Sequence, residues 1–195
     1  MEKLVAVSFE PVEGGREAIS TQLQGLAEAV FLADLDPHGR AGAISRADVL
    51  FASHFYKGEI DDREWPLFGS LKFIQTLYAG VEKTPFGLLP AGVPLASNAG
   101  TFAEPLAEQV LTLALACAKR LFPKFAGMRA GSFDRSPTNR SLAGGTCVIV
   151  GFGGIGKAVA RRMKALGMTV WGVSRSGRPG EGADRVGKLE ELNSM

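Results

Sequence analysis

The sequence lacks any long uninterrupted apolar run, and this absence excludes one class of protein at the outset. A membrane-spanning helix needs roughly 18 or more consecutive apolar residues, and no segment of the 195 residues reaches that length. The first residues, Met1 to Val5, lead directly into a strand-like pattern and do not resemble a signal peptide. We therefore predict a cytoplasmic protein without a membrane partner.

Cysteine and histidine are both scarce, with two residues of each. Cys117 and Cys147 have neither the spacing of metal ligands nor that of a disulfide framework, so we expect two buried, reduced thiols and no metal site. For His38 and His54 we expect positions on the surface. The alternative for His54 is that it borders a ligand cleft together with Tyr56, because ligands gather at the carboxyl ends of parallel strands.

An excess of charge is also missing. The formal net charge is +2, and a nucleic-acid partner would call for basic residues gathered on one face. With 46% hydrophobic and 22% charged residues, the composition is that of an ordinary globular protein. We therefore expect no nucleic-acid partner, and small acidic ligands remain open.

The first hundred residues alternate short apolar runs with helix-like stretches. Helical patterns cover residues 15–27 and 37–46, and the expected strands lie at residues 4–9, 29–32, 48–52, 73–77 and 93–96. This alternation is typical of a parallel sheet covered by helices on both faces. We predict a flavodoxin-like doubly wound α/β domain over residues 1–100.

The middle of the chain combines a long apolar segment with a polar one. Residues 101–105 contain a potential capping box and a proline suited to a first helical turn. Leu106 to Phe122 is apolar nearly all round, which predicts a buried helix. Lys124 to Arg140 is rich in Gly, Arg, Ser and Pro and is interpreted as a linker. Residues 101–140 are therefore assigned to an interdomain helix and linker.

A glycine-rich turn follows the next strand. Thr146 to Val150 forms a buried-strand run, a helical stretch covers Lys157 to Leu166, and Thr169 to Val173 supplies a second strand. Strand, glycine turn, helix and strand in this order are typical of a dinucleotide site, and this context outweighs a merely structural glycine turn. We predict that residues 141–195 are the start of a Rossmann NAD(P)-binding domain. Its cofactor-binding residues are Gly151, Phe152, Gly153, Gly154, Ile155 and Gly156.

Each of three glycines in this turn has its own physical role. Gly151 permits the tight turn, Gly153 lets the backbone approach a pyrophosphate, and Gly156 allows close packing of helix on strand. The amides and the dipole at the start of the helix both favour an anion there.

The residues at the end of the second strand indicate whether NAD or NADP is preferred. An NAD site usually presents a carboxylate at this point, whereas this chain has Ser174, Arg175 and Ser176. An arginine there holds a 2′-phosphate by charge-assisted hydrogen bonds. We predict NADP in preference to NAD, the alternative being a solvated surface arginine.

Three stretches resemble the D-isomer-specific 2-hydroxyacid dehydrogenases, which include glyoxylate and hydroxypyruvate reductases. The first covers residues 71–83, the second covers residues 93–100 with 107–109, and the third is residues 141–146, which run into the glycine turn. The resemblance spans almost the whole chain. It implies an oxidoreductase that transfers a hydride between NAD(P)H and a small 2-keto or 2-hydroxy acid.

The resemblance also implies a substrate loop and an oligomer. In that family the loop matching Ala79, Gly80 and Val81 lies at the interdomain cleft and binds the substrate carboxylate through backbone N–H groups. Without the resemblance, the same residues would be interpreted as a plain turn at the end of a strand. Relatives commonly form homodimers through the cofactor domain, and residues 121–140 are candidates for an arm.

The family's catalytic arginine, carboxylate and histidine lie beyond the second strand of its cofactor domain, and no residue of this sequence takes their place. We therefore assign no catalytic residue and expect an N-terminal portion, truncated within the cofactor domain and inactive as it stands. We also expect residues 146–195 to be dynamic or paired with another chain, because two strands and one helix bury little surface. The alternative function is a non-catalytic nucleotide-binding or association module. A different Rossmann oxidoreductase fits the glycine turn but not the preceding 140 residues.

Overall fold

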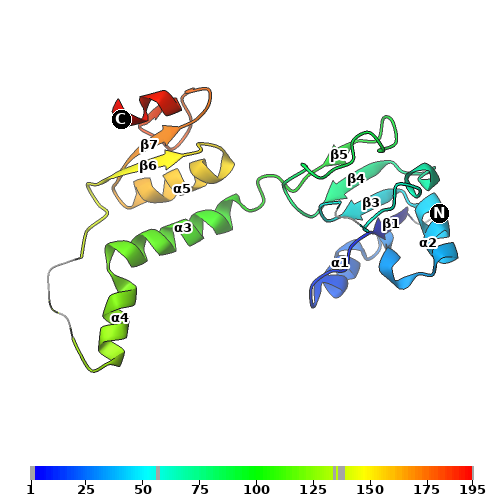
Figure 1. Ribbon diagram of the computed structural model, residues 1–195, viewed down its shortest axis with the longest axis horizontal. Helices are drawn as coiled ribbons and strands as arrows, with labels where there is room; N and C mark the ends of the chain where they lie inside the picture. Colours follow the sequence, from blue (N-terminus) through cyan, green and yellow to red (C-terminus); the bar gives the residue numbers. More distant parts are fainter. Residues whose placement is uncertain (1–2, 56–57, 134, 136–138, 195) are drawn as a thin grey trace. The chain divides into compact units, whose positions relative to one another are not determined.

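The computed structural model describes residues 3–55, 58–133, 135 and 139–194. The chain divides into two compact units, which we call unit 1 (Met1–Ala99) and unit 2 (Gly100–Met195). Each unit contains a parallel sheet with flanking helices (Figure 1). The predicted α/β class is therefore confirmed.

Unit 1 contains a five-stranded sheet in the order β2-β1-β3-β4-β5, and every pair of neighbouring strands is parallel. This order is that of flavodoxin-like sheets, as the sequence predicts. The strands in chain order are β1 (Lys3–Val7), β2 (Ala27–Phe31), β3 (Val49–Ala52), β4 (Phe73–Thr76) and β5 (Leu95–Ala96).

The core of unit 1 lies on one face of this sheet. Alternate side chains of β1, β3 and β4 point to that face, as the twofold repeat of a strand requires, and they include Leu4, Leu50 and Ile74. Helix α2 (Pro37–Arg46) and the short helix η2 (Trp65–Leu67) contribute to the same core.

The opposite face of the sheet is covered less completely than the sequence predicts. Helix α1 (Gly15–Leu23) has no buried residue. A groove of about 670 Å³ runs between α1 and the sheet, lined in part by Val5, Val49 and Phe51. Helices were expected to cover both faces of the sheet, but only the face that packs against α2 is fully covered. Helix α1 leaves part of the other face open, because it is short and contacts mainly β2.

Unit 2 contains a three-stranded parallel sheet in the order β6-β7-β8. Its strands are β6 (Thr146–Val150), β7 (Thr169–Val173) and β8 (Arg185–Gly187), and helix α5 (Gly154–Ala165) connects the first two. Strand β8 is not predicted from the sequence, because its three residues include a single large apolar side chain. The short helix η3 (Leu189–Ser194) follows.

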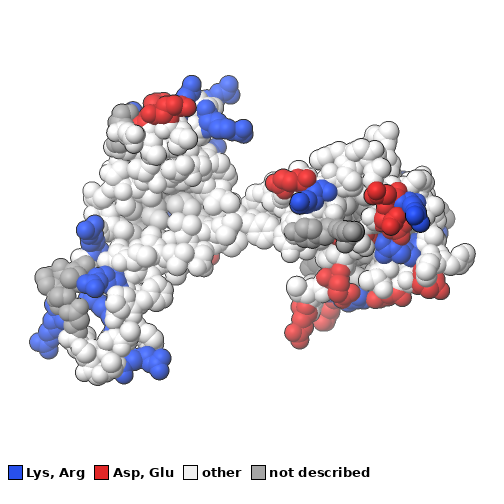
Figure 2. All heavy atoms as spheres, viewed as in Figure 1, with Lys and Arg blue, Asp and Glu red and all other residues white. Residues whose placement is uncertain are grey.

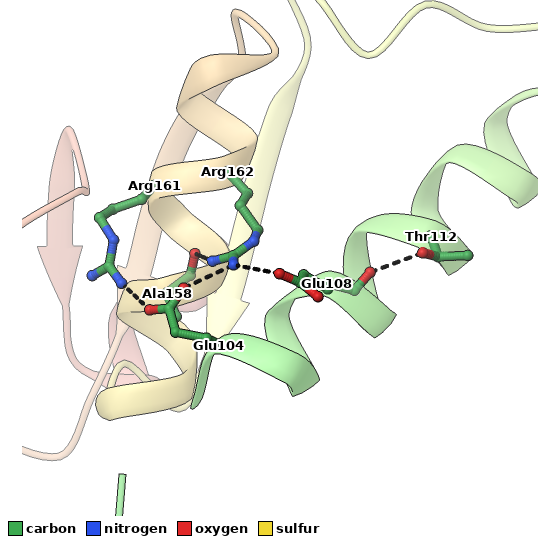
Figure 3. A network of polar contacts seen from close by, with 6 residues as sticks. All are labelled: Glu104, Glu108, Thr112, Ala158, Arg161 and Arg162. Atoms are coloured by element: carbon green, nitrogen blue, oxygen red, sulfur yellow. Dashed lines mark hydrogen bonds and ion pairs between the residues drawn. The ribbon is translucent and has the colours of Figure 1, made fainter. Parts of the chain in front are cut away.

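Helix α3 (Ala103–Ala118) packs against α5 within unit 2. Phe102 occupies the N-cap position of α3 without a side-chain capping bond. Glu104, predicted to complete a capping box, instead accepts hydrogen bonds from Arg161 and Arg162 of α5 (Figure 3). The Arg162 Nη2 to Glu104 Oε2 distance is 2.7 Å. A polar network therefore ties α3 to α5.

The prediction that the apolar helix is buried all round is wrong. Only Ala107 and Ala116 of α3 are buried, whereas Leu106, Val110 and Leu113 are exposed. These three lie at intervals of four and three residues and therefore share one face of the helix. Helix α3 therefore has one apolar face that packs against α5 and another apolar face that is exposed.

Two further expectations for this region need correction. Cys117, expected to be a buried thiol, is exposed on α3, whereas Cys147 is half-buried; both thiols are free. Helix α4 (Leu121–Arg129) occupies the beginning of the segment interpreted as a linker. None of the side chains of α4 is buried.

Two features are absent from the described part of the chain. None of its helices has both the length and the apolar character that crossing a bilayer demands. The same residues contain no group of three or more His, Cys, Asp or Glu side chains placed to hold a metal ion.

Candidate functional site

The glycine turn of unit 2 begins at the end of β6. Gly151 has a φ of 98°, a conformation that L side chains rarely adopt. Its N–H and that of Phe152 both donate to the carbonyl oxygen of Val173, at 2.9 and 3.0 Å. The first two amides of the turn are therefore used to fix it against the end of β7.

The next amides belong to the start of α5. Gly153 is the N-cap residue, and the first helical hydrogen bond runs from Lys157 N–H to the Gly153 carbonyl. The N–H groups of Gly154, Ile155 and Gly156 precede that bond and have no acceptor within the helix. Added Cβ atoms at Gly153 or Gly154 would meet nothing within 4 Å. Open space and helix-end amides together suit a diphosphate.

Gly156 has a different role, because it lies against the preceding turn. A Cβ added there would collide with the carbonyl oxygen of Gly151 and lie 3.3 Å from Cγ2 of Ile149. Only glycine lets α5 pass this close to β6. This contact is the close packing of helix on strand that the sequence analysis predicted for Gly156.

Phe152 combines a place in the turn with a place in the core. Its side chain is buried, and Cβ atoms added at Gly172 or Gly180 would overlap its ring. The ring therefore anchors the turn between β7 and the segment that follows it. The glycine that interrupts the apolar run of β7 is the sequence signal for this contact.

The turn and the end of β7 line an open pocket of about 820 Å³. This volume is in the range of small-molecule sites. Six of the nine predicted cofactor residues line it: Gly151, Phe152, Gly153, Ser174, Arg175 and Ser176. The other three, Gly154, Ile155 and Gly156, supply the amides at the start of α5.

Two serine hydroxyls shape the loop after β7. Oγ of Ser174 accepts a hydrogen bond from the N–H of Gly177 at 3.2 Å, and Oγ of Ser176 accepts one from Arg178 N–H at 3.3 Å. Arg175 lies between these serines, exposed, and forms no ion pair with any other described residue. Its guanidinium is therefore available to an anion in the pocket.

In unit 1, the predicted substrate loop Ala79–Val81 follows β4. The carbonyl of Tyr78, just before the loop, accepts hydrogen bonds from Thr76 Oγ1 at 2.7 Å and from Asn98 N–H at 3.2 Å. A Cβ added at Gly80 would lie 2.5 Å from Oε2 of Glu82. The loop is thus held at its start, and a flexible, exposed carboxylate lies over its glycine.

A buried carboxylate organises the end of β3. Glu59 accepts hydrogen bonds from the hydroxyl of Ser8 at 3.0 Å and from the N–H groups of Ser53 and His54 at 2.8 and 3.2 Å. The imidazole of His54 stacks on the ring of Tyr78, with centroids 3.7 Å apart and an interplanar angle of 19°. The sequence gives no signal for this role of Glu59, because Ser8 lies 51 residues away in the chain.

The two histidines therefore differ. His38 is exposed on α2, as predicted, whereas His54 is half-buried and lines a pocket at the carboxyl ends of the strands. The surface position expected for His54 is thus wrong. The alternative paired it with Tyr56, which lies outside the described residues.

Comparison with known proteins shows which protein family the chain resembles. Residues 111–195 match the family model described as D-isomer specific 2-hydroxyacid dehydrogenase, NAD binding domain. Among curated proteins, a glyoxylate reductase from Thermococcus litoralis is 32% identical over 104 residues, which are 49% of this chain and 31% of that protein.

Solved structures are similar over almost the whole chain. A glycerate dehydrogenase related protein from Thermoplasma acidophilum is 30% identical with a TM-score of 0.67, over 93% of this chain and 57% of that one. An NADPH-dependent glyoxylate/hydroxypyruvate reductase from Sinorhizobium meliloti, in complex with NADP and sulfate, has a TM-score of 0.75 at 24% identity. That match covers 99% of this chain and 58% of the reductase. The chain therefore spans less than two thirds of the length of these relatives.

Proposed function

We propose that the chain is a member of the D-isomer-specific 2-hydroxyacid dehydrogenase family and that it supplies the substrate loop and the cofactor turn of an NAD(P)-dependent oxidoreductase. The reaction is hydride transfer between NAD(P)H and a small 2-keto or 2-hydroxy acid. Unit 2 binds the cofactor and unit 1 binds the carboxylate of the acid.

The observation that carries this proposal is the turn before α5. Its first two amides are bonded to Val173, the amides of Gly154, Ile155 and Gly156 have no acceptor within the helix, and open space lies beside Gly153 and Gly154 at the positive end of that helix. A dinucleotide diphosphate has the charge and the hydrogen-bond acceptors that such a site requires. When bound, the cofactor supplies the hydride.

NADP is the preferred cofactor in this proposal, with NAD as the weaker ligand. The support is Arg175, which lines the pocket and forms no ion pair among the described residues. A guanidinium at the end of the second strand holds a 2′-phosphate by charge-assisted hydrogen bonds. The similar reductase from Sinorhizobium meliloti is in complex with NADP, which agrees with this preference.

In unit 1 we assign carboxylate binding to the backbone of Ala79, Gly80 and Val81. Glu82 must swing away from Gly80 when the acid binds, since two carboxylates in contact repel each other. Reduction of a keto acid also needs a proton donor and a cation at the carbonyl oxygen. Both histidines of the chain lie in unit 1 and are not assigned this role, so these 195 residues are proposed to bind without turnover.

The proposed partner, apart from the small acid, is a second copy of the chain. Helix α4 presents Leu121, Phe122, Phe125 and Met128, each more than half exposed. Exposed apolar surface of this kind marks interfaces. Lys and Arg side chains gather around α4 on the face of unit 2 seen in Figure 2, so salt is expected to strengthen the contact between two copies. A cytoplasmic location remains part of the proposal.

Calorimetric titration of the intact chain with NADPH and NADH tests this function. The proposal predicts saturable binding of both cofactors, with NADPH the tighter ligand. Tighter binding of NADH contradicts the role of Arg175, and failure of both to bind contradicts the cofactor site. Binding of NADPH that no 2-keto acid influences favours the alternative, a non-catalytic nucleotide-binding or association module.

A further inference from the structure

A second pocket lies in unit 1 and shares no lining residue with the pocket beside the glycine turn. It measures about 480 Å³ and opens at the carboxyl ends of β1, β3 and β4. In open parallel sheets, ligands bind in crevices at this edge. Most of its wall is apolar and is formed largely by Phe9, Val12, Ile19, Phe51, His54 and Tyr78.

Aromatic rings form two sides of this pocket. Phe9 and Phe51 meet edge to face with centroids 5.2 Å apart, and His54 stacks on Tyr78. Tyr78 is 40% exposed, so part of its ring remains open to a ligand. Aromatic walls of this kind favour a flat apolar group, which gains from ring contacts in addition to burial.

The pocket adjoins the loop proposed to bind the substrate carboxylate. Tyr78 directly precedes Ala79, and the Tyr78 carbonyl is fixed by Thr76 and Asn98. The aromatic wall and the proposed carboxylate site are therefore adjacent in the chain, and Tyr78 belongs to the wall.

Two polar side chains of the pocket, Glu10 and Ser53, already have partners within unit 1. Glu10 is paired with Arg16, whose Nε lies 2.9 Å from Oε1, and the Ser53 hydroxyl donates to Glu59. Among the described residues that line the pocket, none is a lysine or an arginine. A phosphate or a second carboxylate would meet the carboxylate of Glu10 and no cation in this wall, which disfavours it.

We infer that this pocket receives the uncharged aryl side chain of a 2-hydroxy or 2-keto acid, with His54 and Tyr78 as specificity-determining residues. The inference rests on the proposed function and adds the substrate class: aryl-substituted acids in preference to phosphorylated ones. Glu59 accepts hydrogen bonds from the N–H groups of Ser53 and His54, which fixes the backbone that carries the imidazole.

Nuclear magnetic resonance of the histidines tests this inference on the intact chain. The chain has two histidines, and His38 lies on α2 outside the pocket, which makes it an internal reference. D-phenyllactate is expected to shift the imidazole signals of His54 saturably, leave those of His38 in place, and bind roughly tenfold more tightly than D-3-phosphoglycerate. Unmoved His54 signals, or equal or tighter binding of D-3-phosphoglycerate, would overturn the inference.

Two matched variants extend this test. Val12→Lys places a cation at the rim of the pocket on a side chain that is 84% exposed, whereas Leu26→Lys makes the same change at a 70% exposed position outside the pocket. Only Val12→Lys should strengthen the binding of D-3-phosphoglycerate, by several-fold at low salt. An equal effect of both variants shows attraction by net charge alone and contradicts the inference.

The variant His54→Ala and titration with NADPH test the pocket and the cofactor site separately. His54→Ala should weaken D-phenyllactate binding and leave the melting temperature of the chain within a few degrees; unchanged affinity contradicts the inference. NADPH binding without D-phenyllactate binding overturns the inference and leaves the cofactor site intact. Binding of D-phenyllactate without NADPH supports the pocket and refutes the proposed dehydrogenase.

Discussion

The ring of Phe152 lies against Gly172 so closely that a Cβ on residue 172 would sit 2.5 Å from Cδ2 of the ring. This contact joins the glycine turn to β7, the strand whose end carries the proposed 2′-phosphate site. The turn, the core of unit 2 and the pocket before α5 therefore depend on one another.

Replacing Gly172 by alanine should destabilise unit 2. The added methyl group overlaps a buried ring, and overpacking of this kind costs about 1–3 kcal/mol. Chemical denaturation monitored by far-ultraviolet circular dichroism measures the loss. Gly69→Ala in unit 1 is the control, because a Cβ there meets nothing within 4 Å. Equal stability of the two variants would show that Phe152 does not depend on Gly172.

Arg175→Ala should lower the affinity for NADPH by about tenfold and leave the affinity for NADH nearly unchanged. The physical reason is the loss of charge-assisted hydrogen bonds to the 2′-phosphate, which only NADPH carries. Arg178→Ala is the matched control, since Arg178 is also exposed but does not line the pocket. An equal loss for both cofactors would assign Arg175 to the diphosphate instead.

Acid should weaken unit 2 through two carboxylates. The hydrogen bond from Arg162 lowers the pKa of Glu104 below its usual 4.5, and the hydrogen bond from Lys164 lowers the pKa of Asp184 below its usual 3.8. A lowered pKa in the folded state contributes stability above the unfolded pKa, and this stability is lost as pH falls through the folded pKa. We expect the melting temperature to be flat from pH 7 to about 5 and to fall below about 4.5.

The variant Glu104→Gln supplies the control for this pH dependence. It removes the two ion pairs of Glu104 at every pH and leaves the pair between Glu108 and Arg162, so part of the acid-induced fall should disappear. Surface pairs contribute little individually, so the expected change in melting temperature is a few degrees at most. A fall in acid that is identical in wild type and variant would show that Glu104 has no part in it.

Self-association should depend on the exposed apolar face of α4. Phe122→Ser and Phe125→Ser remove apolar side chains that are 64% and 59% exposed, so they should shift the chain toward monomer and leave its folding intact. Sedimentation of the intact chain over a range of concentrations measures this shift. Phe86→Ser, at a 62% exposed position in unit 1, is the control. A wild-type chain that is monomeric throughout contradicts the proposed homodimer.

The parts of the fold that the sequence predicts are those set by neighbouring residues. Helix α2 begins at Pro37, where Asp36 accepts the N–H of Gly39 at 2.7 Å, and both signals lie within four residues. The turn before α5 is predictable for the same reason, because glycines, flanking strand and helix are contiguous. Local sequence also places Ser174, Arg175 and Ser176 at the end of β7.

The parts that the sequence does not predict depend on distant partners. Glu59 joins Ser8 to Ser53 and His54. No sequence pattern predicts the hydrogen bond between Ser8 and Glu59, which are 51 residues apart. Leu113 is exposed although its helix is apolar, because only one face of α3 meets α5. Apolar composition gives the capacity for burial, and the packing partner decides which residues are buried.

The most direct test of the cofactor site follows the backbone amides of the intact, isotope-labelled chain during addition of NADPH. The account predicts saturable shifts at Gly153, Gly154 and Ile155, and a loss of binding by about tenfold or more in Gly153→Ala without loss of stability, because a methyl group there fills space without striking the fold. Saturable NADPH binding that leaves these amides unmoved, or full affinity in Gly153→Ala, would contradict the account.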